Sequence, residues 1–257
     1  AIGGATTGTV TVTNAVAITG STAQVTAALV TAGTLVEVTD AAVTINDTPS
    51  IAELNAIAAK TTGVVTATLA ADSTANLDAL TTSGTDDITI TVNDADAAAV
   101  TAVQLSTIGG KTAGTVTVTN AVAITGDHDQ LTAALVTDST KVVVSDATVT
   151  VNDVDTTAIT AAELSAIGGA TTGTVTVTNA VAITGSAAEA TAALVTAGTL
   201  VVVSDAAVTI NDADSTAIDA TALSAIGNKT TGTVTVTNAV AITGDHDQLT
   251  AALVTAG

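Results

Sequence analysis

The chain of 257 residues contains no Phe, Tyr, Trp, Met, Cys or Arg. Without cysteine it forms no disulfide, and without aromatic side chains it has no platform on which nucleic-acid bases stack. Four Lys stand against 24 acidic residues, so the formal net charge is −20. Phosphate binding needs a basic patch, and we therefore expect no nucleic-acid partner. The acidity suits solubility at high ionic strength, or cation binding.

The missing large residues also restrict the core. Apolar residues make up 47% of the chain, and the core must be packed from Val, Ile, Leu, Ala and the methyl groups of Thr. Such side chains are short, and the β-branched ones favour strands, which suits a thin structure with a narrow interior. No apolar run approaches the roughly 20 residues of a membrane-spanning helix, and no segment resembles a secretion signal. We therefore expect no membrane insertion.

What the sequence has in abundance is repetition. The phrase TGTVTVTNAVAITG occurs at 7–20, 172–185 and 231–244, with a close copy at 113–126. Its first glycines are Gly8, Gly114, Gly173 and Gly232, so the last two intervals are 59 residues and the first is 106. The shortfall falls in a degenerate stretch at 63–83. Each 59-residue unit consists of a glycine-led half, such as 173–197, and a valine-rich half, such as 198–231.

Both halves follow the same plan of two alternating runs and a short helical stretch. Val175 and Val177, then Val181 and Ile183, alternate with polar or small residues, which is typical of half-buried strands. Leucine and isoleucine three residues apart, as in Leu164 with Ile167, indicate one face of a helix. Capping boxes predict where the helices begin, at the pairs Ser21/Gln24, Ser50/Glu53, Thr101/Gln104, Asp127/Gln130, Thr160/Glu163, Ser186/Glu189 and Asp245/Gln248.

Units of this size cannot bury a core alone, whereas stacked units bury one continuously. The sequence therefore predicts a repeat solenoid, a parallel β-solenoid of about nine coils with a short α-helix per coil along one side. Residues 1–257 would form one continuous array, and its start at Ala1 in mid-repeat suggests a fragment of a longer chain. The coils would open near Gly8, Gly33, Gly63, Gly84, Gly114, Thr140, Gly173, Gly198 and Gly232.

Two segments carry a family resemblance: TVTVTNAVAITGDHDQLTAALVT at 115–137 and ITAAELSAIGGATTGTVTV at 159–177. They resemble the repeats of giant secreted and cell-surface proteins of bacteria, especially marine cyanobacteria, and the resemblance covers essentially the whole chain. It implies an extracellular structural or adhesive role and no catalytic residues. The glycine- and aspartate-rich nonapeptide of calcium-binding β-rolls is absent, so calcium binding does not follow from the resemblance.

One candidate ion site comes from aligning neighbouring coils. If Ile124 stacks on Val151 of the next coil and Val92 of the previous one, six carboxylates meet at one corner: Asp94, Asp96, Asp127, Asp129, Asp153 and Asp155. Like charges at strand spacing repel, and oxygen ligands suit Ca²⁺, so this corner is a hypothetical calcium site. The alternative is that these residues make Asx turns and helix caps. The motif GDHDQ at 126–130 and 244–248 has the same two interpretations, a metal or acid/base site or a helix cap.

Catalysis is not indicated, because a phrase repeated at fixed intervals is a building unit, and no His has a distinguished Ser and acid beside it. We therefore expect a non-catalytic extracellular structural protein at the cell surface, a segment of a bacterial surface fibre, surface layer or adhesin stalk. Exposed strand edges would let it self-associate end to end or laterally into filaments. The alternative is a calcium-binding or ice-binding module. Threonine rows such as Thr9, Thr11 and Thr13 suit ice, but alternate coils interrupt them with Glu37, Val143 and Val202.

Overall fold

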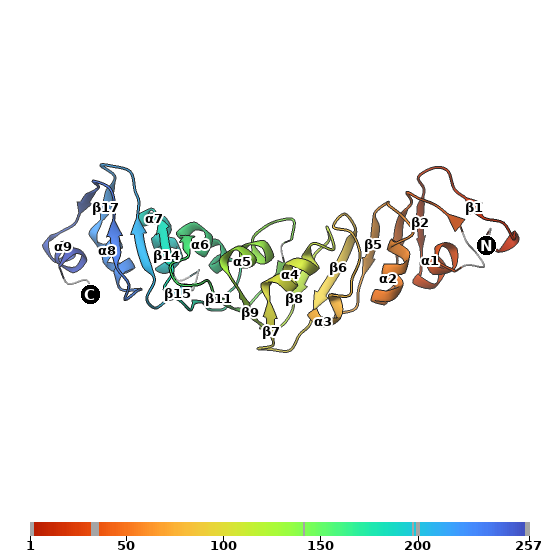
Figure 1. Ribbon diagram of the computed structural model, residues 1–257, viewed down its shortest axis with the longest axis horizontal. Coiled ribbons are helices and arrows are strands. Elements are labelled where there is room, and N and C mark those ends of the chain that lie inside the picture. The colour runs from red at the N-terminus through yellow and green to blue at the C-terminus, as the bar shows by residue number, and fades with distance from the viewer. Residues whose placement is uncertain (1–2, 32–35, 141, 197, 199–200, 255–257) are drawn as a thin grey trace. The chain divides into compact units, whose positions relative to one another are not determined.

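The computed structural model describes residues 3–31, 36–140, 142–196, 198 and 201–254 (Figure 1). Gly33, one of the predicted coil openings, lies outside the described residues. The chain divides into two compact units. Unit 1 comprises Ala1–Asp94, Gln104–Thr119 and Asp138–Val143, and unit 2 comprises Ala95–Val103, Asn120–Thr137 and Val144–Gly257. Each unit is described by itself.

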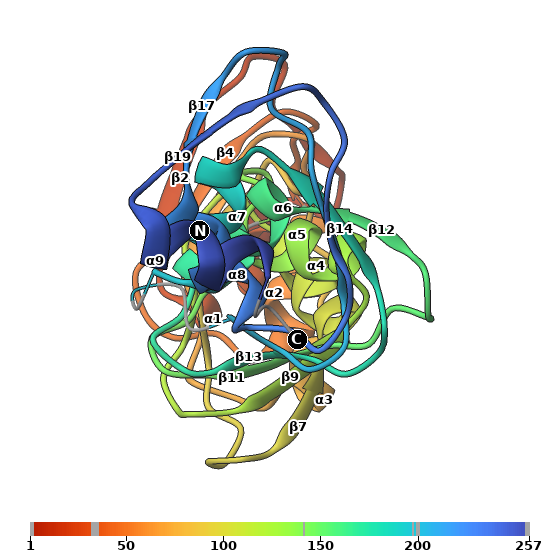
Figure 2. The same cartoon turned by 90° about the vertical axis from the view of Figure 1, so that its left-hand side faces the viewer.

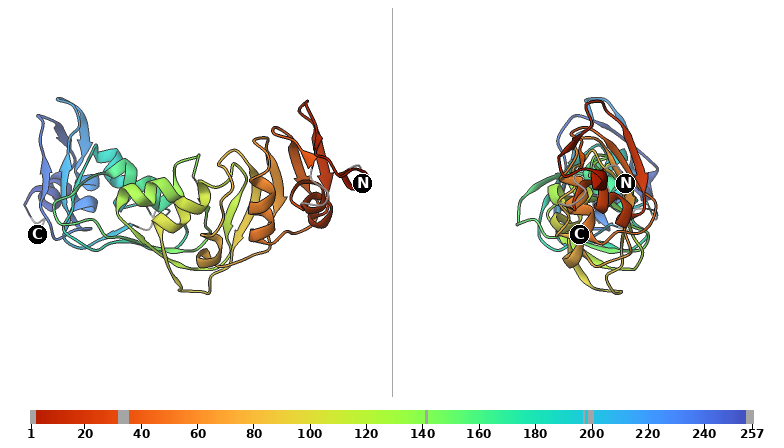
Figure 3. Two further views of the ribbon diagram at one scale, coloured as in Figure 1. Left: turned by 45° about the vertical axis from the view of Figure 1, so that its right-hand side comes forward. Right: turned by 90° about the vertical axis from the view of Figure 1, so that its right-hand side faces the viewer.

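Unit 1 consists of short parallel strands and helices that alternate along the chain. Its strands are β1 (Val10–Thr11), β2 (Ala17–Gly20), β3 (Val36–Glu37), β4 (Ala42–Ile45), β5 (Val65–Thr68), β6 (Asp87–Val92), β8 (Val116–Val118) and β10 (Val142–Val143). Its helices are a 3-10 turn (Gly3–Ala5), α1 (Thr22–Leu29), α2 (Ile51–Ala58), α3 (Thr74–Leu77) and most of α4 (Ala102–Gly109). The strands form a pair, β1-β3, and a six-stranded sheet in the order β10-β8-β6-β5-β4-β2. Helix α1 packs beside α2 (Figure 3, red to orange).

Unit 2 repeats this alternation. Its strands are β7 (Ala99–Thr101), β9 (Ala123–Gly126), β11 (Thr148–Val151), β12 (Ala158–Thr160), β13 (Val175–Val177), β14 (Ala182–Gly185), β15 (Val201–Val203), β16 (Ala207–Ile210), β17 (Ala217–Asp219), β18 (Val234–Val236) and β19 (Ala241–Thr243). Its helices are α5 (His128–Leu135), α6 (Ala161–Gly169), α7 (Ala187–Leu194), α8 (Ala220–Gly227) and α9 (His246–Leu253). The parallel sheets are β15-β13-β11-β9-β7, β12-β14-β16-β18 and β17-β19. Helix α6 packs on α7 and α8 on α9 (Figure 2).

The local predictions from the sequence are confirmed. Val175 and Val177 are 0% and 2% exposed, while Thr176 between them lies on the outer face and is half-buried. Leu164 and Ile167 are fully buried on helix α6. Six of the predicted capping boxes are formed, at Ser21, Ser50, Asp127, Thr160, Ser186 and Asp245. The core therefore consists of the aliphatic residues predicted by the alternation along the strands and by the three-residue spacing along the helices. In the part of the chain that the structure describes, no helix is long and apolar enough to cross a membrane.

The prediction of a single parallel β-solenoid with helices along one side is wrong. The described strands are parallel, but they form five separate sheets that alternate with helices in an α/β arrangement. In unit 2 paired strands lie 24–26 residues apart, whereas the helices from α5 to α9 begin at intervals of 33, 26, 33 and 26 residues. The helices therefore do not keep a constant position relative to the strands from one repeat to the next.

The unequal spacing arises from a third strand that the sequence analysis missed. Strands β7, β12 and β17 each lie between the second strand of a valine-rich half and its helix. Each pairs with the second strand of the next glycine-led half, β9, β14 or β19, and so starts a new sheet. In unit 1, the single long strand β6 pairs with two different strands. Its first residues pair with β5 and its last residues pair with β8. Among the described strands, no single sheet therefore runs through all the repeats.

The glycine that opens four of the described repeats is required by close backbone packing. A Cβ added to Gly173 would lie 2.2 Å from the carbonyl oxygen of Ala147, and Gly63, Gly114 and Gly232 meet equivalent backbone oxygens at 2.3–2.5 Å. Thr171, two residues earlier, donates its hydroxyl to Ala147 O at 2.6 Å and accepts from the Gly173 N–H at 3.0 Å. At these four glycines, the T-x-G sequence thus fixes the approach of one repeat to the one before it.

Candidate functional site

The Asn-Asp sequence that follows the second strand of each valine-rich half places an aspartate at the start of a preceding helix. Asp153 Oδ2 accepts a hydrogen bond of 2.8 Å from the backbone N–H of His128, the first residue of α5. The first amides of a helix lack intrahelical acceptors, and a negative charge is favoured there. The same bond, each of 2.7 Å, joins Asp47 to Thr22, Asp94 to Thr74 and Asp212 to Ala187. These aspartates therefore connect consecutive segments of the chain.

A second aspartate, two residues later, makes a reciprocal contact with the next repeat. Asp155 Oδ1 accepts from the N–H of Ala180 at 3.1 Å, and the N–H of Thr156 donates to Ala180 O at 2.8 Å. Thr156 has a φ of 65°, in the left-handed region that a β-branched residue rarely adopts. Equivalent contacts join Asp96 and Ala97 to Ala121, and Asp214 and Ser215 to Ala239. We call this arrangement the corner clasp.

These contacts show where the six aspartates of the hypothetical calcium site lie. Asp94 and Asp153 bind the first amides of α3 and α5, and Asp96 and Asp155 belong to corner clasps. Asp127 is the N-cap of α5, where its side chain accepts from the Gln130 N–H at 2.8 Å. Asp129 is 88% exposed at its side chain, and its Oδ1 lies 3.6 Å from His128 Nε2.

The register on which the calcium site depended is wrong. Ile124 pairs with Val149 and Val100, not with Val151 and Val92. Among the described residues, no group of three or more His, Cys, Asp and Glu side chains is placed to hold a metal ion. Calcium binding therefore stays a prediction that rests on the sequence pattern alone.

The two copies of GDHDQ differ in their surroundings. His128 is 14% exposed, and its Nδ1 lies 2.7 Å from Asp153 Oδ1. Burial lowers its pKa, but the hydrogen bond and charge of Asp153, with the charges of Asp129 and Glu163, outweigh burial and raise the pKa above its usual value. His246 instead is 91% exposed, and its Nδ1 lies 3.1 Å from Oδ1 of the exposed Asp247. The sequence alone could not distinguish the two, because Asp153 comes from the following repeat.

The His128 arrangement is suited to an ion pair. The aspartate at Nδ1 resembles the orienting carboxylate of a hydrolytic triad. However, the group near Nε2 is the Asp129 carboxylate, at 3.6 Å, and not a hydroxyl nucleophile. An imidazole placed between two carboxylates favours its protonated form and does not activate a nucleophile. The geometry therefore provides an electrostatic link between two repeats.

Threonines line up on the outer faces of the sheets of unit 2 more regularly than the sequence analysis indicated. The predicted interruptions are confirmed, because Thr11 pairs with Glu37, Thr117 with Val143 and Thr176 with Val202. Yet Thr176 also pairs with a threonine on its other side. Two in-register rows result, one of Thr101, Thr125, Thr150 and Thr176 and one of Thr160, Thr184, Thr209 and Thr235. The third strand, which the sequence analysis missed, supplies the first member of each row.

Comparison of the chain with protein-family models, with curated proteins and with solved structures gave no match.

Proposed function

We propose that this chain is a non-catalytic structural protein of the bacterial cell exterior, a segment of a surface fibre, a surface layer or an adhesin stalk. The observation that carries the proposal is the use of the recurring polar residues. Asn-Asp, the corner clasp and T-x-G all make hydrogen bonds between successive repeats. A chain whose repeated polar residues join its own repeats is suited to extension and load bearing.

The charge supports the same role. Twenty-four acidic residues and a net charge of −20 keep a chain soluble in salt water, where exposed like charges are screened. Strands β10 and β15 carry Val143 and Val202, which are 47% and 52% exposed on their outer faces. Exposed valines on strands favour contacts between copies, so the proposal includes association end to end or laterally into filaments.

Surface labelling tests the proposed location. An antibody raised against the 257-residue chain is added to intact cells of the organism that encodes it, with an antibody against a cytosolic protein as control. We expect label on intact cells that protease treatment of those cells removes, while the control labels only permeabilised cells. Label that appears only after permeabilisation would contradict the proposal.

Ice binding is a second candidate function, favoured by the two threonine rows of unit 2. Each row places four threonines on adjacent strands, about 4.8 Å apart, so that hydroxyl and methyl groups repeat regularly on one face. Ice recrystallisation in the presence of the chain is the appropriate assay. Inhibition that Thr150→Lys abolishes, and that Thr157→Lys outside the rows leaves unchanged, would support it. Crystal growth equal to that in buffer would exclude it.

A further inference from the structure

One of the contacts between repeats contains a side chain that titrates near neutral pH. The aspartate of the Asn-Asp sequence binds the first amide of a helix at four places, and the helix residues there are Thr22, Thr74, His128 and Ala187. Threonine and alanine do not titrate, whereas an unperturbed histidine has a pKa of about 6.5. His128 is therefore the one of these four residues whose charge changes near neutral pH.

Carboxylates from three segments of unit 2 act on the His128 imidazole. Asp153, which follows β11, lies 2.7 Å from Nδ1, and Asp129 of α5 lies 3.6 Å from Nε2. Glu163, the one charged residue of α6, acts through its charge. The N-cap Asp127 instead binds an amide in the first turn of α5, and strand β9, which also packs against α5, carries no charged residue. One imidazole thus stands among three acidic groups.

The protonated imidazole supplies the positive charge of this cluster. Among the described residues, no lysine forms an ion pair with any of the three carboxylates. Asp153 is 5% exposed and accepts from both the backbone N–H and the imidazole of His128. A neutral imidazole still donates to a carboxylate, but a charge-assisted hydrogen bond is about twice as strong as a neutral one. Loss of the proton therefore weakens the attachment of Asp153 to the start of α5.

We propose that His128 is a pH-sensitive latch within unit 2. While its imidazole is protonated, it holds the first turn of α5 to the segment that follows β11 and to α6. When the imidazole loses its proton, the first turn of α5 opens locally. The latch is a property of the fold and does not depend on where the protein is located.

The direction of the response follows from the pKa of His128. Burial lowers this pKa, but the hydrogen bond and charge of Asp153, with the charges of Asp129 and Glu163, outweigh burial and raise it. A group whose folded pKa is raised contributes fully below its unfolded pKa, and the contribution is lost as pH rises through the folded pKa. The latch is therefore closed at low pH and released as pH rises.

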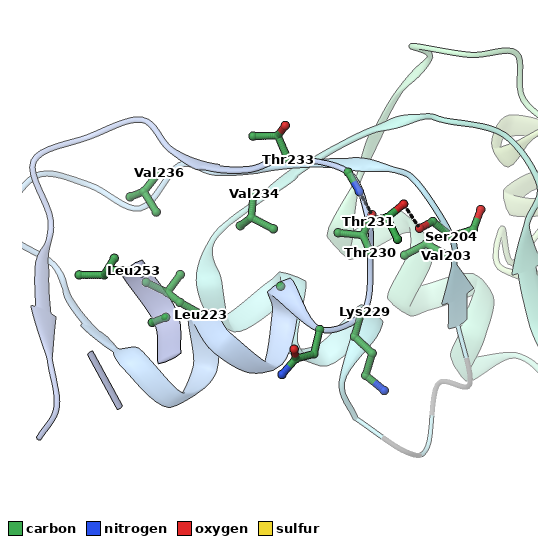
Figure 4. Close-up of a pocket in the computed structure, with 14 residues that line it drawn as sticks. Val203, Ser204, Leu223, Lys229, Thr230, Thr231, Thr233, Val234, Val236 and Leu253 are labelled. Atoms are coloured by element: carbon green, nitrogen blue, oxygen red, sulfur yellow. Dashed lines mark hydrogen bonds between the residues drawn. The ribbon is translucent and has the colours of Figure 1, made fainter. Parts of the chain in front are cut away.

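Amide hydrogen exchange between about pH 5.5 and 8.5 tests the latch within one molecule. The Ala187 amide is the matched reference, because it donates to Asp212 at 2.7 Å without a histidine. The Thr231 amide is a second reference, because it donates to the Ser204 carbonyl of the preceding repeat at 2.8 Å (Figure 4). After correction for intrinsic exchange rates, we expect the protection of the His128 amide to fall about threefold or more relative to both references as pH rises.

The variant His128→Thr separates the latch from the fold. Threonine occupies the equivalent position in α1, where the Thr22 hydroxyl donates to Asp47 at 2.6 Å, so we expect this variant to fold. The amide of residue 128 should then remain protected and lose its pH dependence relative to the two references. In nuclear magnetic resonance of the unmodified chain, the His128 imidazole should titrate above the unperturbed value of about 6.5.

Four results would overturn the proposal. Three of them are a protection of the His128 amide that stays constant relative to the references, a pH dependence that persists in His128→Thr, and an imidazole that titrates at or below the unperturbed value. The fourth is an equal loss of protection at all three amides, which would show that the whole fold and not the first turn of α5 responds to pH.

Discussion

Replacing Gly173 with alanine tests whether the repeated glycine is there for packing. The new Cβ would lie 2.2 Å from Ala147 O, 2.6 Å from Ala147 C and 2.7 Å from Asp146 O, whereas ordinary contacts begin near 3.4 Å. All three atoms belong to the backbone of the preceding repeat, directly before β11, and no side-chain rotation relieves the clash. The chain around Gly173 must therefore shift by about 1 Å.

The shift has two costs that can be estimated. Overpacking of this kind typically costs about 1–3 kcal/mol. The shift also disturbs the Thr171 hydroxyl bond to Ala147 O, and a hydrogen bond of this kind contributes a net of about 0.5–1.5 kcal/mol. We therefore expect Gly173→Ala to lower the free energy of unfolding by about 2–4 kcal/mol.

Gly169→Ala is the matched control, four residues away. No heavy atom lies within 4 Å of a Cβ at Gly169, the last residue of α6, so we expect a gain of about 0.4–1 kcal/mol from the restricted unfolded chain. Urea unfolding followed by circular dichroism measures both variants, because a chain without Trp or Tyr gives no useful fluorescence. A Gly173→Ala variant as stable as the unmodified chain would refute the packing explanation.

Three further predictions concern charge, backbone strain and ions. Because the folded pKa of His128 is raised, its ion pair stabilises the fold fully below the unfolded pKa of about 6.5, and this contribution is lost as pH rises through the folded value. The stability difference between the unmodified chain and His128→Asn should therefore fall as pH rises above about 6.5, and a rise would contradict the assignment. Thr156→Gly should stabilise the chain by about 0.5–1 kcal/mol, because the left-handed region costs residues other than glycine about 1–2 kcal/mol, whereas glycine costs about 0.5–1 kcal/mol in backbone entropy. Thr157→Gly, at a residue outside the left-handed region, should destabilise the chain in the same urea assay. Equal effects of the two substitutions would contradict the explanation. If the chain binds calcium, isothermal titration should detect binding that is weaker in a variant carrying both Asp129→Asn and Asp155→Asn. The absence of millimolar or tighter binding would refute the calcium hypothesis.

The sequence predicts the strand faces and most helix starts because local residues determine them. The alternation of Val175 and Val177 selects the buried face, and Ser186 with Glu189 selects the first turn of α7. Register is different, since a shift of two residues keeps every side chain on the same face. Alternation alone could not decide between Ile124 opposite Val149 and Ile124 opposite Val151, and the calcium hypothesis followed from the wrong choice.

The fold class was mispredicted for a related reason. Strand β12 contains one buried residue, Ile159, and runs directly into the capped helix α6, so it has too few residues to show a period of two. That strand makes the valine-rich half longer than the glycine-led half, so the helix of the valine-rich half is displaced relative to the helix of the glycine-led half. The corner clasp was also missed, because its partners, such as Asp155 and Ala180, lie 25 residues apart.

Hydrogen exchange at the start of α7 tests most directly whether the repeated aspartates hold neighbouring repeats together. Asp212→Ala removes the 2.7 Å bond to the Ala187 N–H, and Asp205→Ala removes an exposed aspartate whose side chain accepts from the neighbouring Ser204 hydroxyl. We predict that Asp212→Ala accelerates exchange of the Ala187 amide at least tenfold and lowers the free energy of unfolding by about 1–2 kcal/mol, while Asp205→Ala leaves both unchanged. Unchanged exchange and stability in Asp212→Ala would contradict the structural role of these aspartates.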